Sequence, residues 1–168
     1  MKLLSTVTAA AIAATSPAFA NDAAQINAAI IGIAAGADRH DWDRVRDAFA
    51  DEVMLDYTSL WGGEPATAAA DDVIAQWSGF LPGFDVTHHM VTNETITSID
   101  GDQATAQADF TATHRIGDEL WVLGGRYDYK LANVDGAWKV SALTMTALWE
   151  TGSRDLVGQA AERASAGN

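Results

Sequence analysis

Histidine side chains are the first candidates for acid–base chemistry in this chain of 168 residues, which holds four of them. His114 shares the alternation phase of the small and apolar residues from Ala104 to Phe110, which predicts that its imidazole points toward the interior. His88 and His89 are adjacent in a segment expected to be extended, so one of the two points inward and the other outward. An imidazole titrates near neutral pH and is the usual general base there.

Asp38 and Tyr57 are polar residues in positions that are unusual for their types. Asp38 is expected beside the apolar stripe of a helix and near its C-terminal end, where the helix dipole favours a cation. A solvated aspartate is one interpretation, and a carboxylate placed to meet a cation or an imidazole is the other. Tyr57 lies in phase with Val53 and Leu55, so its ring is expected in the core with a hydroxyl that needs a partner.

Three helices are expected in the first half of the chain. Apolar residues at spacings of three and four predict the first helix over Gln25 to Asp38. Asp41 is a suitable N-cap for a second helix over Trp42 to Ala50. The other expected elements are a short strand, a loop and a third helix, at Val53 to Tyr57, Trp61 to Pro65 and Ala68 to Phe80.

The hydrophobic period changes from about 3.6 residues to about 2 in the second half, which predicts strands separated by hairpin turns. These strands are expected at Val86 to Ile99, Gln103 to Ile116, Leu120 to Val134 and Ala137 to Trp149. A weak helix over Arg154 to Ala164 would follow, within a tail of residues 153–168. The order predicts an α+β domain over residues 21–152, with the helices packed on a strongly curved antiparallel sheet that forms a cone-like half-barrel with one pocket.

The first twenty residues are typical of a cleaved export signal. Lys2 supplies a positive charge, Leu3 to Ala14 is a short apolar run, and Pro17 to Ala20 ends in a small-x-small pattern. The apolar run is too short to span a bilayer permanently. Cleavage after Ala20 would leave 148 residues (168 minus 20) in the periplasm or secreted medium. The alternative, that these residues form an apolar first helix of the mature fold, is disfavoured, because no polar residues are spaced to give such a helix a solvent-exposed face.

The amino-acid composition excludes several kinds of functional site and of binding partner. The chain has no cysteine, which excludes disulfides, thiolate zinc sites and a catalytic thiol. Without Lys2 the basic residues fall from 10 to 9 against 23 acidic ones, so the net charge becomes −14. Such a chain repels phosphate backbones and anionic lipid, so neither nucleic acid nor a membrane is an expected partner. Small neutral or apolar molecules remain as possible partners. The pair Gly124-Gly125 lies in an expected strand, so it is not expected to form a phosphate-binding loop.

Five short motifs occur in an order and spacing that match one known superfamily. They are Asp38 to Arg46, Leu55 to Ser59, Thr87 to Val91, Thr113 to Arg115 and Asp135 to Lys139. The chain resembles the nuclear transport factor 2-like superfamily in its SnoaL-like and scytalone dehydratase branch, over roughly residues 26–149. The resemblance is more specific for the fold than for the activity, because this fold hosts many functions.

The resemblance implies an Asp–His pair that abstracts a proton next to an activating group. Matching the motifs places the orienting carboxylate at Asp38 and the base at His89 rather than His88. Tyr57 and His114 then resemble the water-holding and acid–base residues of the dehydratase. The same pair occurs in related dehydrochlorinases and SnoaL-type cyclases. No cofactor and no metal are implied, although Asp38, His89 and His114 could in principle form a facial metal triad.

Two positions depart from the dehydratase pattern. Ala37 stands where the dehydratase has a second tyrosine, and Tyr127 stands where it has an asparagine. The wall that faces the substrate therefore differs, and the dehydratase's own substrate is not carried over. Tyr127, Phe110 and Trp61 are the residues expected to contact the substrate of this chain.

The leading prediction is a cofactor-independent, metal-free enzyme of the dehydratase or isomerase type. Its substrate would be a small, largely apolar molecule, with cyclic and aromatic compounds as candidates. The first alternative is a non-catalytic periplasmic binding module for a small hydrophobic ligand, and the second is a purely structural or oligomerising domain. The resemblance alone also implies a homodimer that pairs through the exposed face of the sheet.

Overall fold

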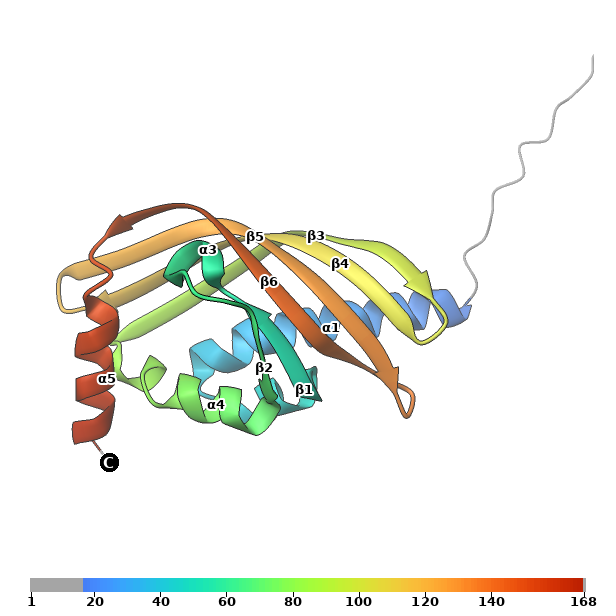
Figure 1. Cartoon of the computed structure of the whole chain (residues 1–168), viewed down its shortest axis with the longest axis horizontal. Coiled ribbons are helices and arrows are strands. Elements are labelled where there is room, and N and C mark those ends of the chain that lie inside the picture. Colours follow the sequence, from blue (N-terminus) through green and yellow to red (C-terminus); the bar gives the residue numbers. More distant parts are fainter. Residues whose placement is uncertain (1–16, 168) are drawn as a thin grey trace, which may run out of the picture.

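A computed structural model describes residues 17–167 (Figure 1). The elements in chain order are α1 (Pro17–Arg39), α2 (Trp42–Ala48), β1 (Phe49–Asp56), α3 (Thr58–Trp61), β2 (Ala66–Ala69), α4 (Ala70–Ser78), the 3₁₀ turn η1 (Leu81–Gly83), β3 (Val86–Asp100), β4 (Gln103–Ile116), β5 (Glu119–Val134), β6 (Ala137–Gly152) and α5 (Leu156–Ala166). The predicted signal peptide lies outside the described residues, except that Pro17 to Ala20 begin α1, and it stays a prediction. No helix within residues 17–167 is long and apolar enough to cross a bilayer.

The six strands form one mixed sheet in the order β2-β1-β6-β5-β4-β3. The four long strands β3 to β6 pair as the predicted antiparallel meander. The expectation of a purely antiparallel sheet was wrong, because β1 pairs with β6 in parallel and β2 adds to the outer edge of β1. Figure 1 shows the long strands passing over α1, with α4 on the same side of the sheet. The strong curl into a cone stays a prediction.

Several element boundaries differ from the sequence expectation. The first helix begins at Pro17 rather than Gln25, and β1 begins at Phe49 rather than Val53. The third helix begins at Ala70 rather than Ala68, because the alanine-rich stretch before it pairs with β1 as β2. The second helix ends at Ala48, because the fully buried Phe49 already belongs to β1. The short helix α3 was not predicted. It begins where the Asp56 carboxylate accepts hydrogen bonds from the Thr58 backbone N–H at 3.0 Å and from its hydroxyl at 2.7 Å.

The core lies between α1 and the inner face of the long strands. The apolar stripe of α1 is buried through Ile26, Ile30, Ile33 and Ala37. The inward phase of β4 was predicted correctly, since its residues are each 2–3% exposed: Ala104, Ala106, Ala108, Phe110 and Ala112. All five belong to the packed core, and of them Ala112 also lines the main cavity.

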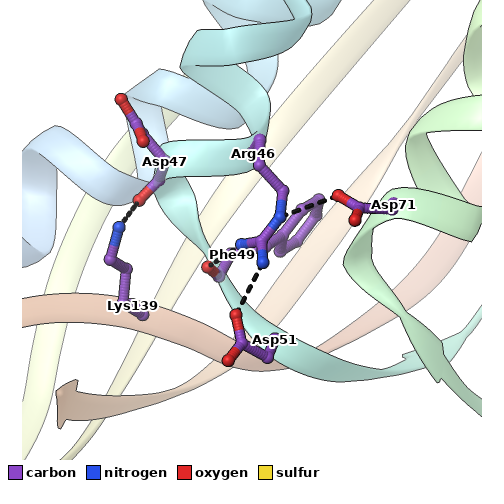
Figure 2. Close-up of polar contacts among 6 residues, drawn as sticks. All are labelled: Arg46, Asp47, Phe49, Asp51, Asp71 and Lys139. Carbon is purple, nitrogen blue, oxygen red and sulfur yellow. Dashed lines mark hydrogen bonds and ion pairs between the residues drawn. The ribbon is translucent and has the colours of Figure 1, made fainter.

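Charged contacts connect the elements on the side of the sheet that carries β1 (Figure 2). Arg46 of α2 donates to Asp51 of β1 at 2.6 Å and to Asp71 of α4 at 2.9 Å. Lys139 of β6 donates to the backbone carbonyl of Asp47. The side chains of Asp51 and Asp71 are 93% and 81% exposed, so each pair contributes at most about 1 kcal/mol. The Arg46 contacts join α2 and α4 to β1, and Tyr57 is the residue that follows β1.

The C-terminal segment is packed onto the domain. Leu156 and Ala160 of α5 are fully buried. A Cβ atom at Gly83 of η1 would lie 1.8 Å from the carbonyl oxygen of Ala160, so only glycine permits this approach. The segment expected as a tail with a weak helix is therefore an integral layer at one end of the sheet, as Figure 1 also shows.

Candidate active site

The last turn of α1 brings a carboxylate against the first long strand. The backbone N–H of His89 in β3 donates to Asp38 Oδ2 at 2.7 Å, and His89 Nδ1 lies 2.6 Å from Asp38 Oδ1. Both carboxylate oxygens are thus engaged by one residue, which fixes the orientation of both groups. The Asp38 and His89 side chains are 12% and 19% exposed, whereas the neighbouring His88 is exposed. In β3, the side chain of His89, and not that of His88, therefore points to the inner side of the sheet.

The electrostatics of the pair determine which histidine nitrogen is free. Burial alone would raise the pKa of Asp38, but the hydrogen bonds and the positive potential of His89 outweigh burial and lower it. The carboxylate is therefore charged at neutral pH and accepts the proton on Nδ1. In neutral His89 the lone pair then resides on Nε2, which is the tautomer a general base requires.

A cavity of about 740 Å³ lies between the helices and the inner face of the sheet. Its walls are mainly apolar, and the polar or aromatic side chains among them include His89, His114, Tyr57, Tyr127 and Trp61. Asp38 does not line this cavity. It faces a separate hollow of about 470 Å³ between α1 and β3, and His89 forms part of the wall of both. Asp38 is therefore placed to act on the main cavity only through His89.

His114 is enclosed by aromatic rings. It is 4% exposed, with its ring centroid 4.7 Å from that of Trp121, 5.0 Å from Phe84 and 5.2 Å from His89. Burial, followed by the positive potential of His89, lowers the pKa of His114 to about 4, despite opposing effects of the Trp121 backbone and Asp38. His114 is thus neutral near pH 7, and its Nδ1 has no hydrogen-bond partner in the described part of the chain. It can serve as a neutral hydrogen-bonding group, not as a cationic acid.

The other expected site residues occupy different depths. Tyr57 lies between β1 and α3, and burial raises its pKa, so its phenol is neutral. Trp61 ends α3 at the rim, where the residue is 51% exposed and the Arg154 guanidinium lies 4.9 Å from the centroid of its ring. Phe110 does not line the cavity, and its ring stacks on that of Tyr127 with the centroids 4.2 Å apart. Phe110 supports the wall rather than forming it.

Some wall residues were not identified from the sequence. Tyr129 lines the cavity beside Tyr127, and its alternation phase could have indicated this. Val157 and Ala161 of α5 also line it, but no sequence signal connects that helix to the cavity. Asp38, His89 and His114 were the possible metal triad. Within residues 17–167, no group of three His, Cys, Asp or Glu side chains is arranged to hold a metal ion.

The comparisons with known proteins agree with this architecture. The SnoaL-like domain family matches residues 18–144. No curated protein sequence matches the chain. Among solved structures, the Kfla4162 protein from Kribbella flavida has a TM-score of 0.73 and 26% identity, over 88% of this chain and 99% of the relative.

Two further solved structures are named for an activity. A scytalone dehydratase-like protein from Novosphingobium aromaticivorans has a TM-score of 0.69 and 18% identity, over 82% of this chain and 91% of its own. A hexachlorocyclohexane dehydrochlorinase (LinA type 2) has a TM-score of 0.67 and 17% identity, over 81% and 91%. At these identities the two structures establish the fold alone. The family match over most of the chain and the shared α+β architecture make this chain a SnoaL-like protein of the nuclear transport factor 2-like superfamily.

Proposed function

We propose that this protein is a cofactor-independent acid–base enzyme of the dehydratase or isomerase type, with His89 as the base and Asp38 as its orienting carboxylate. The observation that carries the proposal is the two-point contact between these residues in the wall of a largely apolar cavity. The names of the dehydratase and dehydrochlorinase relatives, which describe eliminations, support the same class of reaction.

In the proposed step, His89 Nε2 takes a proton from a substrate carbon next to a carbonyl. The C–H bond breaks, an N–H bond forms, and the electron pair moves onto the carbonyl oxygen, while the Asp38 carboxylate stabilises the imidazolium. Neutral Tyr57 and His114 would donate hydrogen bonds to that oxygen or to a leaving hydroxyl. In a dehydration the hydroxyl takes a proton and leaves as water as a C=C bond forms, and in an isomerisation the proton returns to another carbon. General-base assistance of this kind contributes about 10²–10⁴-fold in rate.

The lining of the cavity supports an uncharged substrate. Among the described residues that line it there is no lysine or arginine, and the acidic ones are Glu64 and Asp72. A carboxylate or phosphate group would enter without a cationic partner, at an unfavourable electrostatic free energy. A small, largely apolar ring compound with a carbonyl or hydroxyl fits these walls best.

The competing function is a carrier of a small hydrophobic ligand. The mainly apolar walls favour this alternative, because they would bind such a molecule whether or not His89 takes a proton. The two functions differ in turnover, since a carrier has affinity but transfers no proton.

Two further properties belong to the proposal. The chain would be exported after cleavage at Ala20, and it would pair with a second copy through the outer face of the sheet. The exposed Leu148 and Trp149 near the end of β6, 56% and 49% accessible, support such pairing. Light scattering of the protein and of Trp149→Lys should give a dimer and a monomer, respectively, and a monomeric parent protein would contradict the pairing.

The test of the acid–base function uses 1-tetralone, an uncharged bicyclic ketone with acidic protons beside its carbonyl. In D₂O the protein should accelerate the exchange of these protons, as followed by proton NMR. His89→Gln should lower the rate about 10²-fold or more while the affinity for the ketone changes little. A protein that binds 1-tetralone without accelerating exchange is a carrier, and the proposed enzyme function would then be wrong.

A further inference from the structure

Two buried side-chain atoms lack a hydrogen-bond partner within residues 17–167, and they are Thr87 Oγ1 and His114 Nδ1. Thr87 of β3 pairs directly with His114 of β4, so both side chains stand on the inner face of the sheet at the same level. His89 lies two residues further along β3 on the same face. An unpaired hydroxyl at this place needs an explanation, because leaving a buried donor without an acceptor costs free energy.

The Thr87 hydroxyl lies close to the carboxylate of Asp38. Thr87, Asp38 and His89 line the same hollow between α1 and β3, and the backbone N–H of His89 holds the carboxylate beside this strand at 2.7 Å. Burial raises the pKa of Asp38, whereas the contacts with His89 and, as the smallest contribution, the Thr87 hydroxyl lower it. The hydroxyl is therefore near enough to act on the carboxylate, although its geometry falls short of a full hydrogen bond.

The hydroxyl has one hydrogen to donate and two candidate acceptors. Asp38 is a charged carboxylate at neutral pH, whereas His114 Nδ1 belongs to a neutral ring. Hydrogen bonds to an ionised acceptor are roughly twice as strong as bonds between neutral groups. A carboxylate oxygen also accepts more than one hydrogen bond, so Asp38 can accept from Thr87 and keep both contacts with His89. The carboxylate is therefore the favoured acceptor.

We propose that Thr87 is a positioning residue whose hydroxyl donates to the Asp38 carboxylate and, through it, sets how readily His89 takes a proton. The effect on a catalytic base rests on the proposed function, whereas the hydrogen bond itself does not. The bond withdraws negative charge from the carboxylate, which weakens its attraction for the His89 imidazolium. Thr87 thus keeps His89 unprotonated to a lower pH than a carboxylate bonded to His89 alone would.

The other titratable groups around the pair keep their charges when Thr87 is changed. The hollow contributes Arg39, His88 and Glu94. The main cavity contributes Glu64, Asp72, His114, Tyr57, Tyr127 and Tyr129. The Arg39 guanidinium donates to the Ala35 carbonyl of its own helix at 3.0 Å. Burial lowers the pKa of His114 to about 4 and raises the pKa of each tyrosine, so these groups do not titrate near neutral pH.

The test follows the ring of His89 by nitrogen-15 NMR as the pH is varied, which requires no turnover. Thr87→Val keeps the branched shape but removes the hydroxyl, so the titration midpoint of His89 should rise by about half a pH unit or more. Thr87→Ala should raise it in the same way, and Thr87→Ser should restore the parent midpoint. An unchanged midpoint in the valine and alanine variants, or a failure of serine to restore it, would overturn the inference.

Thr92→Val is the matched control, because Thr92 is an exposed residue of the same strand in the outward phase. It should leave the midpoint unchanged, and a shift equal to that of Thr87→Val would assign the effect to the strand rather than to the hydroxyl. A response of the His114 nitrogens alone to Thr87→Val would show that the hydroxyl donates to that ring, which would also overturn the inference. Circular dichroism establishes that each variant is folded.

Exchange of the 1-tetralone protons in D₂O separates this inference from the proposed function. In Thr87→Val the pH profile of the exchange rate should move upward with the His89 titration, while the plateau at high pH changes less than about twofold. A shifted titration without any exchange by the parent protein would reject the enzyme and retain the role of Thr87. Exchange by the parent with an unshifted titration in the variant would retain the enzyme and reject that role.

Discussion

At the residue scale, Asp38 matters because both of its oxygens contact one histidine. Its bond to Nδ1 selects the tautomer, and its bond to the backbone N–H of His89 fixes the strand beside it. The candidate positions could be predicted from single residues: the phase placed His114 inside, and the resemblance chose His89 over His88. The neutrality of His114 could not be predicted, because it depends on Phe84 and Trp121 packing around the ring.

The histidine tautomer can be observed directly. Nitrogen-15 NMR of the His89 ring at neutral pH should show the proton on Nδ1 in the parent protein. In Asp38→Asn the carboxylate acceptor is gone, so the Nδ1-protonated form should lose its dominance. The same tautomer distribution in both proteins would mean that the two residues are not coupled in solution.

The burial of His114 should make stability depend on pH. Its pKa is about 4 in the folded protein and about 6.5 when unfolded, so the unfolded state binds the proton first as the pH falls. The free energy of unfolding should therefore decrease between pH 6.5 and pH 4, by up to about 3 kcal/mol from this residue. Urea unfolding of His114→Gln should show a smaller decrease across this range. An equal decrease in both proteins would assign the effect to other groups.

At the element scale, the secondary structure of the second half followed from the sequence, whereas parts of the first half did not. Residues of β4 alternate cleanly, and the strand was predicted with the observed bounds, Gln103 to Ile116. Helix propensity suggested that Ala68 and Ala69 begin a helix, but pairing with β1 overrides it. The short α3 begins where the Asp56 carboxylate accepts the Thr58 N–H, a local bond that no periodic pattern reveals.

The contact between η1 and α5 can be tested with two glycines. Gly83→Ala places a methyl group against the Ala160 carbonyl, so α5 must shift, and we expect a loss of at least about 2 kcal/mol in the free energy of unfolding. Gly158→Ala is the matched control within α5, because no atom lies within 4 Å of the added Cβ. It should be neutral or stabilising by up to about 1 kcal/mol. Equal effects of the two changes would show that α5 does not pack closely on η1.

At the scale of the whole molecule, the sheet and helices gather all three tyrosines around one mainly apolar cavity. From the sequence we expected an α+β chain with one pocket. The residues that line the pocket come from distant segments of the chain, and only some of them were predicted. Tyr129 shared its phase with Tyr127 and was identifiable, but Val157 and Ala161 were not, since only the folded chain brings α5 beside the cavity.

The burial of the tyrosines should be visible in one spectroscopic titration of the whole protein. Burial raises the pKa of Tyr57, Tyr127 and Tyr129, so the folded protein should show no tyrosinate absorbance near pH 10, the ordinary pKa. The unfolded chain ionises first as the pH rises, so stability should fall above about pH 10. In denaturant the three groups should titrate normally. Tyrosinate that forms near pH 10 in the folded protein would contradict the enclosed cavity.

The most direct test of the central claim is a double-mutant cycle on the exchange of the 1-tetralone protons in D₂O. If Asp38 and His89 act as one unit, Asp38→Asn and His89→Gln should each lower the exchange rate steeply, by about 10²–10⁴-fold for the base. The double variant should then be no slower than His89→Gln alone, because Asp38 acts only through His89. Rates that fall in the double variant by the product of the two single effects would contradict the account, as would full activity in either single variant.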